Sequence, residues 1–274
     1  MSALTTSKVS ASKHASLLKV CVLASGSKGN AIYISNGQAS ILVDAGLSGK
    51  EIERRMSARK LDPKSLTGIV VSHEHSDHVK GVGIISRRFK LPVYISPKTA
   101  QAASAQIGKL HQTTYFNCGS SFDIQGLEIR PFSTSHDAED PAGFTFRYKG
   151  QKIGLATDLG VATQMVKEHL KGCNLLILEA NHDSDMLING PYPWHLKQRI
   201  KSRKGHLSND DSCKLLGKVL HKDLAWVVLA HLSEQNNHPE KALRRVSQAL
   251  ENQRFKLKFH VASQYESSRV IQII

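Results

Sequence analysis

The sequence has few cysteines and no long apolar run. Its 274 residues include four cysteines, at positions 21, 118, 173 and 213, and no two of them show CxxC spacing. This pattern argues against a zinc knuckle or a disulfide framework and is typical of a reducing, cytoplasmic setting. The best apolar runs, such as 175–178 and 225–230, are far shorter than the ~18 residues that a membrane helix needs. We therefore expect a cytoplasmic protein without a membrane segment.

Acidic residues are also scarce relative to basic ones. Lys and Arg total 37 against 23 Asp and Glu, so the formal net charge is +14. An excess of this size favours a polyanionic partner such as nucleic acid, and a solvated basic surface without a partner is the alternative. The hydrophobic content of 40% is that of a globular chain. The length suits one large α/β domain or two small ones.

The distribution of apolar residues favours a single domain. Residues 1–18 are rich in Ser, Thr, Ala and Lys, which predicts a flexible basic N-terminal tail. Short apolar runs and amphipathic segments then alternate without a Pro- or Gly-rich linker, which predicts one α/β domain over residues 19–274. Strands are expected at 20–24, 31–34, 41–43, 69–71, 92–95, 127–131, 143–148, 152–156, 175–178, 225–229 and 256–261. Helices are expected at 49–60, 81–89, 97–107, 161–170, 209–220 and 239–252.

The most informative segment is His73-Glu74-His75-Ser76-Asp77-His78, directly after the apolar run 69–71. In an extended chain residues i and i+2 point the same way, so His73 and His75 can converge on one ion. Asp77 and His78 lie one turn further along and can face a second ion. Three imidazoles and a carboxylate suit Zn²⁺, Mn²⁺ or Fe better than Ca²⁺ or Mg²⁺ alone. The segment therefore predicts a metal site.

Further metal-ligand candidates stand at the ends of later predicted strands. His136 follows the run that ends at residue 132, Asp158 follows 154–156, and His231 follows 226–230. Functional groups of α/β proteins usually lie where a strand meets its loop, so these side chains are expected to complete the site.

These motifs resemble those of the metallo-β-lactamase fold superfamily. The HxHxDH pattern at 73–78 is its signature, and Val43-Asp44-Ala45-Gly46 is similar to its first motif. The segments at 24–30, 135–137, 156–160, 179–183, 205–209 and 230–233 resemble the YycJ/WalJ-type subgroup. The resemblance extends over nearly the whole chain from Lys19.

The resemblance implies an α/β fold, a four-layer αβ/βα sandwich with the metal site at the mouth between two sheets. It implies two divalent metal ions, Zn²⁺ or Mn²⁺ with Fe as a further option, and a hydroxide formed between them. It also implies that Asp44 supports the metal loop without binding metal, and that Asp158 bridges the two ions. The remaining implied ligands are His73, His75 and His136 for one ion, and Asp77, His78 and His231 for the other.

The resemblance further implies a DNA exonuclease that acts from the 5′ end, with Asp77, Glu179 and His206 in the catalytic machinery. His206 would donate a proton or hydrogen bond to the scissile phosphate, and capping of the next helix is the alternative. Glu179 would orient His206, with a loop-fixing hydrogen bond as its alternative. Neither the inserted domain nor the arm of the RNA-processing relatives is recognisable in the sequence, and both the choice of DNA over RNA and the polarity come from the resemblance alone. A small-molecule thioester or lactone hydrolase, and a nucleic-acid-binding module without catalysis, are the rival interpretations.

A basic run leads up to His206 and can follow a phosphate backbone, although such runs are more often solvated faces. His182 and Ser208 are further candidates for phosphate contact, and the glycine-rich segment 26–30 is either an anion-binding nest or a plain turn. The basic candidates for contact with nucleic acid are Lys197, Arg199, Lys201, Arg203 and Lys204.

Overall fold

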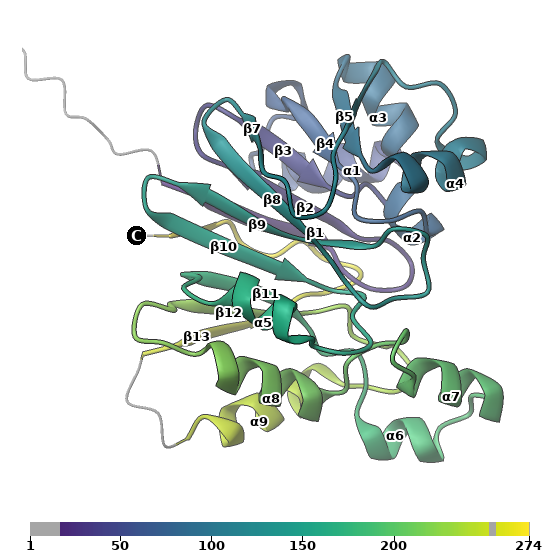
Figure 1. The fold of residues 1–274 in the computed structure, drawn as a ribbon, viewed down its shortest axis with the longest axis vertical. Coiled ribbons are helices and arrows are strands. Elements are labelled where there is room, and N and C mark those ends of the chain that lie inside the picture. The colour runs from purple at the N-terminus through teal and green to yellow at the C-terminus, as the bar shows by residue number, and fades with distance from the viewer. Residues whose placement is uncertain (1–16, 252–255, 274) are drawn as a thin grey trace, which may run out of the picture.

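The computed structural model describes residues 17–251 and 256–273, which form two seven-stranded sheets packed face to face (Figure 1). The first sheet contains, in spatial order, β14 (Ile271–Gln272), β1 (Lys19–Ala24), β2 (Ala31–Ser35), β3 (Ser40–Val43), β4 (Gly68–Val70), β5 (Pro92–Ile95) and β6 (Gln112–Tyr115). The second contains β13 (Lys258–Val261), β12 (Trp226–Ala230), β11 (Leu175–Glu179), β10 (Gln151–Ala156), β9 (Ala142–Tyr148), β8 (Leu127–Ser133) and β7 (Phe122–Ile124).

Helices cover the outer faces of both sheets (Figure 1). Those of the first half are α1 (Gly49–Ala58), α2 (Ser76–Val79), α3 (Val82–Phe89) and α4 (Pro97–Ile107), with the 3₁₀ turn η1 (Pro63–Ser65). Those of the second half are α5 (Gln164–Leu170), α6 (Ser184–Asn189), α7 (Trp194–Lys201), α8 (Asn209–Val219) and α9 (Pro239–Ala249). None of the helices in the described segments is long and apolar enough to cross a membrane.

The core has three apolar clusters, one between each pair of adjacent layers. The cluster between the sheets joins residues such as Ile34 and Phe144, and each of the other two joins a sheet to its helices. Strands β1, β2 and β3 are apolar at nearly every position, as expected where both faces of a sheet are covered. The predicted four-layer, single-domain α/β sandwich is confirmed.

Several boundaries differ from the predicted ones for local reasons. Helix α5 begins at Gln164 rather than 161 because the Thr163 side chain caps it by accepting from Val166 N–H. Strands β6, β7 and β14 and helices α6 and α7 were not predicted. The predicted end of α9 at 252 and the tail residues 1–16 lie outside the described residues. Leu18, the last residue of the expected tail, is fully buried in the core between the sheets.

Strand direction brings the ligand-bearing loops together. Strands β8, β10, β11 and β12 run parallel to one another, so the loops that follow them leave the second sheet at one edge. Strands β3 and β4 of the first sheet are parallel in the same way. The loops after these strands carry the side chains predicted to bind metal.

Candidate metal centre

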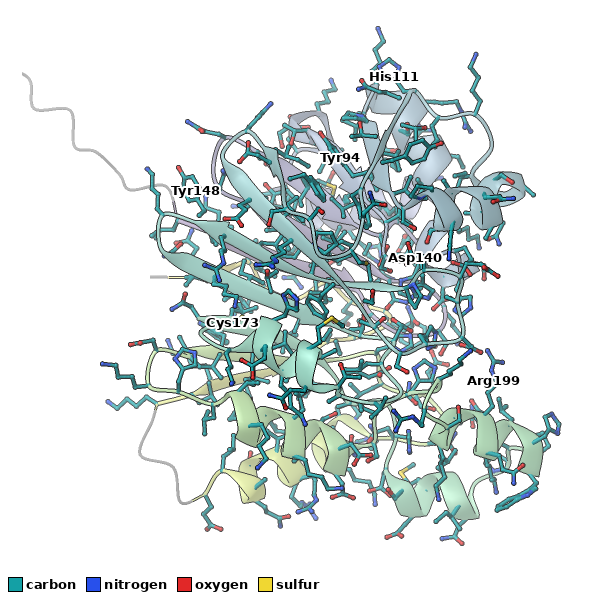
Figure 2. All side chains as sticks on the ribbon, in the orientation of Figure 1. Tyr94, His111, Asp140, Tyr148, Cys173 and Arg199 are labelled. Carbon is teal, nitrogen blue, oxygen red and sulfur yellow. The ribbon has the colours of Figure 1, made fainter. Side chains whose placement is uncertain are left out.

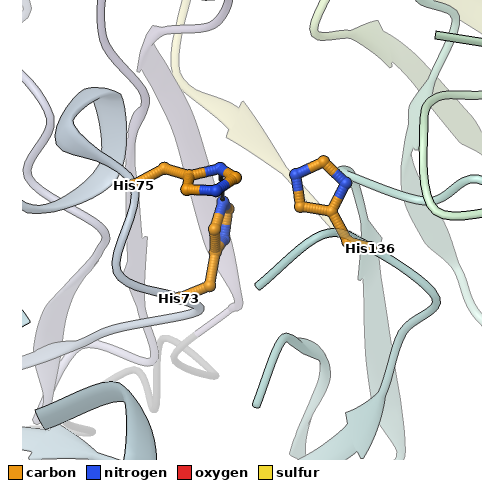
Figure 3. A group of neighbouring side chains, drawn as sticks. All are labelled: His73, His75 and His136. Carbon is orange, nitrogen blue, oxygen red and sulfur yellow. Dashed lines mark hydrogen bonds between the residues drawn. The ribbon is translucent and has the colours of Figure 1, made fainter. Parts of the chain in front are cut away.

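The first group of candidate ligands is His73, His75 and His136, which come from the loops after β4 and β8 and face one another (Figure 3). One ring nitrogen from each of the three lies within 4.8 Å of the others. His73 Nε2 is 3.1 Å from His75 Nδ1. The structure therefore brings together the three imidazoles that the sequence assigns to one ion.

The second group is Asp77, His78 and His231. His231 Nε2 lies 3.8 Å from Asp77 Oδ2, and His78 Nε2 lies 3.5 Å from the same oxygen. Asp158 stands between the two groups, because its Oδ1 is 3.8 Å from His136 Nε2 and 3.6 Å from His231 Nε2. The placement of Asp158 is the one expected of a carboxylate that contacts both ions.

Two buried polar atoms in this centre have no hydrogen-bond partner: Asp158 Oδ2 and His231 Nε2. Leaving a buried polar atom unsatisfied costs about 1–3 kcal/mol, so such atoms call for a partner. The separations of 3.5–3.8 Å across the second group are close to the ~3.3–3.6 Å between two ligands of one tetrahedral ion with ~2.0–2.2 Å bonds. The residues present thus fit divalent cations.

Hydrogen bonds at the second ring nitrogen fix which nitrogen each histidine presents. The Nδ1 atoms of His73, His78 and His136 bond Ser72 Oγ, Asp44 Oδ2 and Gly205 O. His231 Nδ1 bonds Glu179 Oε1. These four rings therefore present Nε2 to the centre. In His75 the order is reversed, since Nε2 bonds Asp137 O and Nδ1 faces His73. Such outer partners are typical of metal-binding histidines.

Asp44 holds the loop that carries the HxHxDH motif through hydrogen bonds to Ser72 and His78. Its Oδ1 accepts from Ser72 N–H at 2.7 Å, and its Oδ2 bonds Ser72 Oγ and His78 Nδ1, each at 2.8 Å. Asp44, Asp158 and His231 all have positive φ, at 60°, 54° and 55°. A left-handed conformation in non-glycine residues costs of order 1–3 kcal/mol and is concentrated at functional sites.

Glu179 holds two histidines at once. Its Oε1 accepts from His206 Nδ1 at 2.7 Å and from His231 Nδ1 at 3.0 Å, while Oε2 accepts from Leu159 N–H and Leu207 N–H. Burial disfavours the charged carboxylate, but His206 and His231 outweigh this effect and lower the pKa of Glu179 to about 2. Because an ionised carboxylate only accepts, both Nδ1 atoms must carry hydrogen. The sequence suggested the contact with His206 and missed the one with His231.

His206 lines a cavity of about 270 Å³ together with Asp77, Asp158 and His231. Its side chain keeps 20% exposure, whereas that of Glu179 is fully buried. The capping alternative for His206 is excluded, because the N-cap of α8 is Ser208, whose hydroxyl accepts from Asp211 N–H.

The basic run 197–204 does not form one continuous stripe, because residues 194–201 are helix α7. Lys197 Nζ donates to Ile188 O, whereas Arg199 lines the cavity and bonds Asp137 Oδ2 at 2.7 Å. Lys201, Arg203 and Lys204 lie outside the cavity lining. Two further lining residues, Asp137 and Tyr192, had no predicted role, although Asp137 directly follows the predicted ligand His136.

The phosphate contacts of His182 and Ser208 stay a prediction, and neither residue lines the cavity at the metal centre. The two residues are 3% and 4% exposed, and their backbones form a parallel bridge that joins the loops before α6 and α8. Segment 26–30 is a plain turn rather than an anion-binding nest. Its N–H groups at Gly26, Lys28 and Asn30 already donate to Asn30 Oδ1, Gln264 Oε1 and Asp77 O.

Comparison with known proteins agrees with this geometry. A model of the beta-lactamase superfamily domain matches residues 39–231. The chain belongs to this superfamily. It is 40% identical over 240 residues to exodeoxyribonuclease YycJ of Bacillus anthracis, a match that covers 87% of this chain and 91% of that protein. It is 37% identical over 228 residues to exodeoxyribonuclease WalJ of Streptococcus pneumoniae, over 82% and 85% of the two chains.

Solved structures of the superfamily share the fold. The metallo-beta-lactamase fold protein YhfI from Bacillus subtilis superposes with a TM-score of 0.72, covering 92% of this chain and 99% of that one, at 15% sequence identity. At this identity the likeness shows the fold alone. The predicted superfamily and subgroup are confirmed.

Proposed function

We propose that this chain is a metal-dependent exodeoxyribonuclease with a two-cation centre. The observation that carries the proposal is Asp158, a buried carboxylate with one unsatisfied oxygen that lies between two ligand groups. A carboxylate is the side chain best suited to offer one oxygen to each of two cations. The proposed ions are Zn²⁺ or Mn²⁺, with Fe as an alternative, because imidazole and carboxylate ligands suit all three.

When bound, the two cations supply Lewis-acid activation of the attacking water and of the phosphate. The protein orients the candidate metal ligands through hydrogen bonds that the structure already contains. Asp44 and Glu179 hold His78 and His231 with Nε2 turned inward. The ligand geometry is thus set before substrate arrives, which spares reorganisation during the reaction.

His206 is proposed to act on the leaving group. Its Nδ1–H donates to ionised Glu179 at 2.7 Å, which fixes the ring with Nε2 turned to the cavity. When the ring carries a second proton on Nε2, that N–H can donate to the phosphate or to the leaving oxygen. This arrangement gives Glu179 a positioning role and His206 the contact with substrate.

DNA as substrate and cleavage from the 5′ end are part of the same proposal. DNA as substrate is supported by the names of the two relatives, both exodeoxyribonucleases, and by the basic character of the chain. Cleavage from the 5′ end rests only on the resemblance to the YycJ/WalJ-type subgroup. Arg199 is the basic residue of the run that lines the cavity, so it is the proposed phosphate contact beside the metal centre.

The test is digestion of end-labelled single- and double-stranded DNA and RNA by purified protein, with and without added Mn²⁺ or Zn²⁺. We expect metal-dependent loss of nucleotides from the 5′ end of DNA. Asp158→Ala should lower the rate at least about 10³-fold, and His206→Ala about 10²- to 10³-fold, since each removes transition-state stabilisation.

His111→Ala is the matched control, because His111 is exposed and absent from the cavity lining. It should leave the rate unchanged. Intact nucleic acids, together with hydrolysis of a thioester or lactone by the same preparation, would replace the proposal with a small-molecule hydrolase.

A further inference from the structure

A second cavity lies away from the metal centre, at the hairpin that joins β9 to β10. It has a volume of about 580 Å³, compared with about 270 Å³ for the metal cavity, and no candidate metal ligand lines it. Figure 2 labels Tyr148 at this hairpin and Arg199 beside the metal centre, at opposite sides of the molecule. We name this cavity the hairpin pocket. Its charged lining residues are Glu128, Arg147, Lys149, Lys152 and Lys171.

The hairpin pocket therefore has four cations and one carboxylate in its lining. Lys171 pairs with Glu168 at 2.7 Å. Within the described part of the chain, Arg147, Lys149 and Lys152 form no ion pair at 4.0 Å or less. Glu128 Oε1 accepts from Ser121 Oγ. Glu128 is the cross-strand partner of Arg147 in the β8–β9 register, so it offsets the positive charge of the pocket only in part.

The fold places these cations close together at a cost. Arg147 and Lys152 are direct cross-strand partners in the β9–β10 register, and like charges in that relation are destabilising. Lys152 is only 8% exposed. Burial lowers the pKa of Lys152, and repulsion from Arg147 and Arg130 adds to the effect. Cys173 nearby provides no counter-charge at neutral pH, because burial raises the pKa of its thiol to about 12.

Lys152 also retains a donor for a ligand. Its Nζ donates to His169 O and Lys171 O, each at 2.6 Å, at the end of α5. A lysine ammonium has three hydrogens, so the third is left over at a residue that lines the pocket. These two hydrogen bonds hold Lys152 in place, unlike an ordinary surface lysine.

The turn itself does not explain Lys149. Lys149 and Gly150 have φ of 45° and 81°, the signs required at the two central positions of a type I′ hairpin turn. Asn or Asp followed by Gly is the preferred pair for this turn. Lysine adopts the positive φ of this turn position less readily than Asn or Asp. Its backbone preference therefore does not explain Lys149, and we attribute the residue to its positive charge.

We propose that the hairpin pocket is a second phosphate-binding site, occupied by the backbone of a nucleic acid whose end lies at the metal centre. Lys152 is the held contact, and Arg147 and Lys149 provide two further ones, with Lys149 Nζ 5.1 Å from the centre of the Tyr148 ring. The residues from Gln151 to Asp158 span about 23 Å at ~3.3 Å per residue. Because β10 is buried within the sandwich, a nucleic acid on the surface must cover at least this distance, which takes at least about seven nucleotides at ~3.4 Å each. The site adds to affinity only for strands long enough to reach it. This length dependence rests on the proposed nuclease function, whereas the phosphate site does not.

The test compares two double variants of the full chain with bound metal. Arg147→Gln with Lys149→Asn removes two charges from the pocket and gives the turn its preferred residue, so the fold should be retained. Lys64→Gln with Lys109→Gln removes two exposed charges elsewhere. Binding is measured by fluorescence anisotropy over a series of salt concentrations, with nuclease-resistant phosphorothioate oligonucleotides of 20 and about 4 nucleotides. Inorganic phosphate and a nucleoside monophosphate serve as competitors.

We expect the pocket variant to bind the long oligonucleotide about tenfold more weakly, with the magnitude of the log–log salt slope reduced by about 2, and the short one unchanged. The control variant should change affinity less than twofold. Equal losses in both variants would overturn the proposal. Competition by inorganic phosphate or the monophosphate that the pocket variant abolishes would support the proposal. Direct binding of either competitor that the pocket variant abolishes, with unchanged affinity for the long oligonucleotide, would keep a phosphate site but overturn the backbone as its occupant. If the wild-type protein cleaves no DNA while the pocket variant still loses affinity for the long strand, the proposed function fails and this site stands.

Discussion

The two ends of strand β10 handle charge in opposite ways. At the end that precedes Asp158, buried carboxylates are surrounded by imidazoles, and nearly every polar atom has a defined partner. At the end that begins with Gln151 and Lys152, four cations line an open pocket, and of these only Lys171 forms an ion pair within the described residues. One sheet thus presents anionic ligands for cations at one edge and cations for an anion at the other. Rigidity is needed at the first edge, where ligand geometry decides activity, and much less at the second.

The largest expected effect is a glycine substitution that tests this difference in rigidity. A Cβ at Gly46 would overlap the carbonyl oxygen of Asp77, whereas a Cβ at Gly150 would have nothing within 4 Å. Gly46→Ala should displace the metal loop, abolish metal binding and destabilise the protein by about 3–5 kcal/mol. Gly150→Ala should cost only about 1–2 kcal/mol, because its φ is 81°.

Thermal melting and elemental analysis of both glycine variants provide the measurement. Equal losses of stability, or full metal content in Gly46→Ala, would contradict the idea that the metal end is the rigid one.

A smaller effect is expected when a carboxylate is neutralised at each end. Glu179→Gln keeps the shape, but the amide has one acceptor oxygen, so its NH2 group would face either the two imidazole donors or the two N–H donors that surround Glu179. We expect a loss of about 10- to 100-fold in metal affinity or kcat, the range found for outer partners of metal ligands. Glu128→Gln at the hairpin end removes an acceptor of one hydrogen bond and should change the rate less than twofold. A similar kcat in the two variants would contradict the proposed positioning role of Glu179.

The smallest effect concerns Arg199. Its guanidinium bonds Asp137 at the cavity rim and is 62% exposed, so it can turn towards a phosphate. Arg199→Gln should weaken DNA binding about three- to tenfold and reduce the salt slope by about 1, with kcat nearly unchanged. Steady-state kinetics at several salt concentrations distinguishes an effect on DNA binding from an effect on kcat. A fall in kcat with KM unchanged would instead make Arg199 a positioning residue for Asp137.

The grouping of the candidate metal ligands was largely predictable because these residues are concentrated in one short motif and in single residues at strand ends. The strands themselves were predictable from apolar runs that are buried on both faces. The β6 segment Gln112–Tyr115 escaped prediction because it is an edge strand with mostly exposed, polar residues. Helix α7 was not predicted because its basic residues suggested an extended contact with phosphate rather than a helix.

Other features depend on residues that only the fold brings together. Glu179 touches His206 and His231, which lie 27 and 52 positions away, and no spacing rule links them. The hairpin pocket combines Arg147 and Lys149 with Lys171, from different elements. Conversely, the basic run 197–204 is conspicuous in the sequence, but the structure does not keep it together. Helix α7 ends at Lys201, and its helical turn points Arg199 in a different direction from Lys197 and Lys201.

The most direct test of the central claim is anomalous diffraction from crystals of the protein grown with Mn²⁺ or Zn²⁺. The account predicts two peaks on either side of Asp158. One should lie among His73, His75 and His136, and the other among Asp77, His78 and His231. A single peak, or two peaks that Asp158 does not join, would contradict a two-cation centre built on this carboxylate.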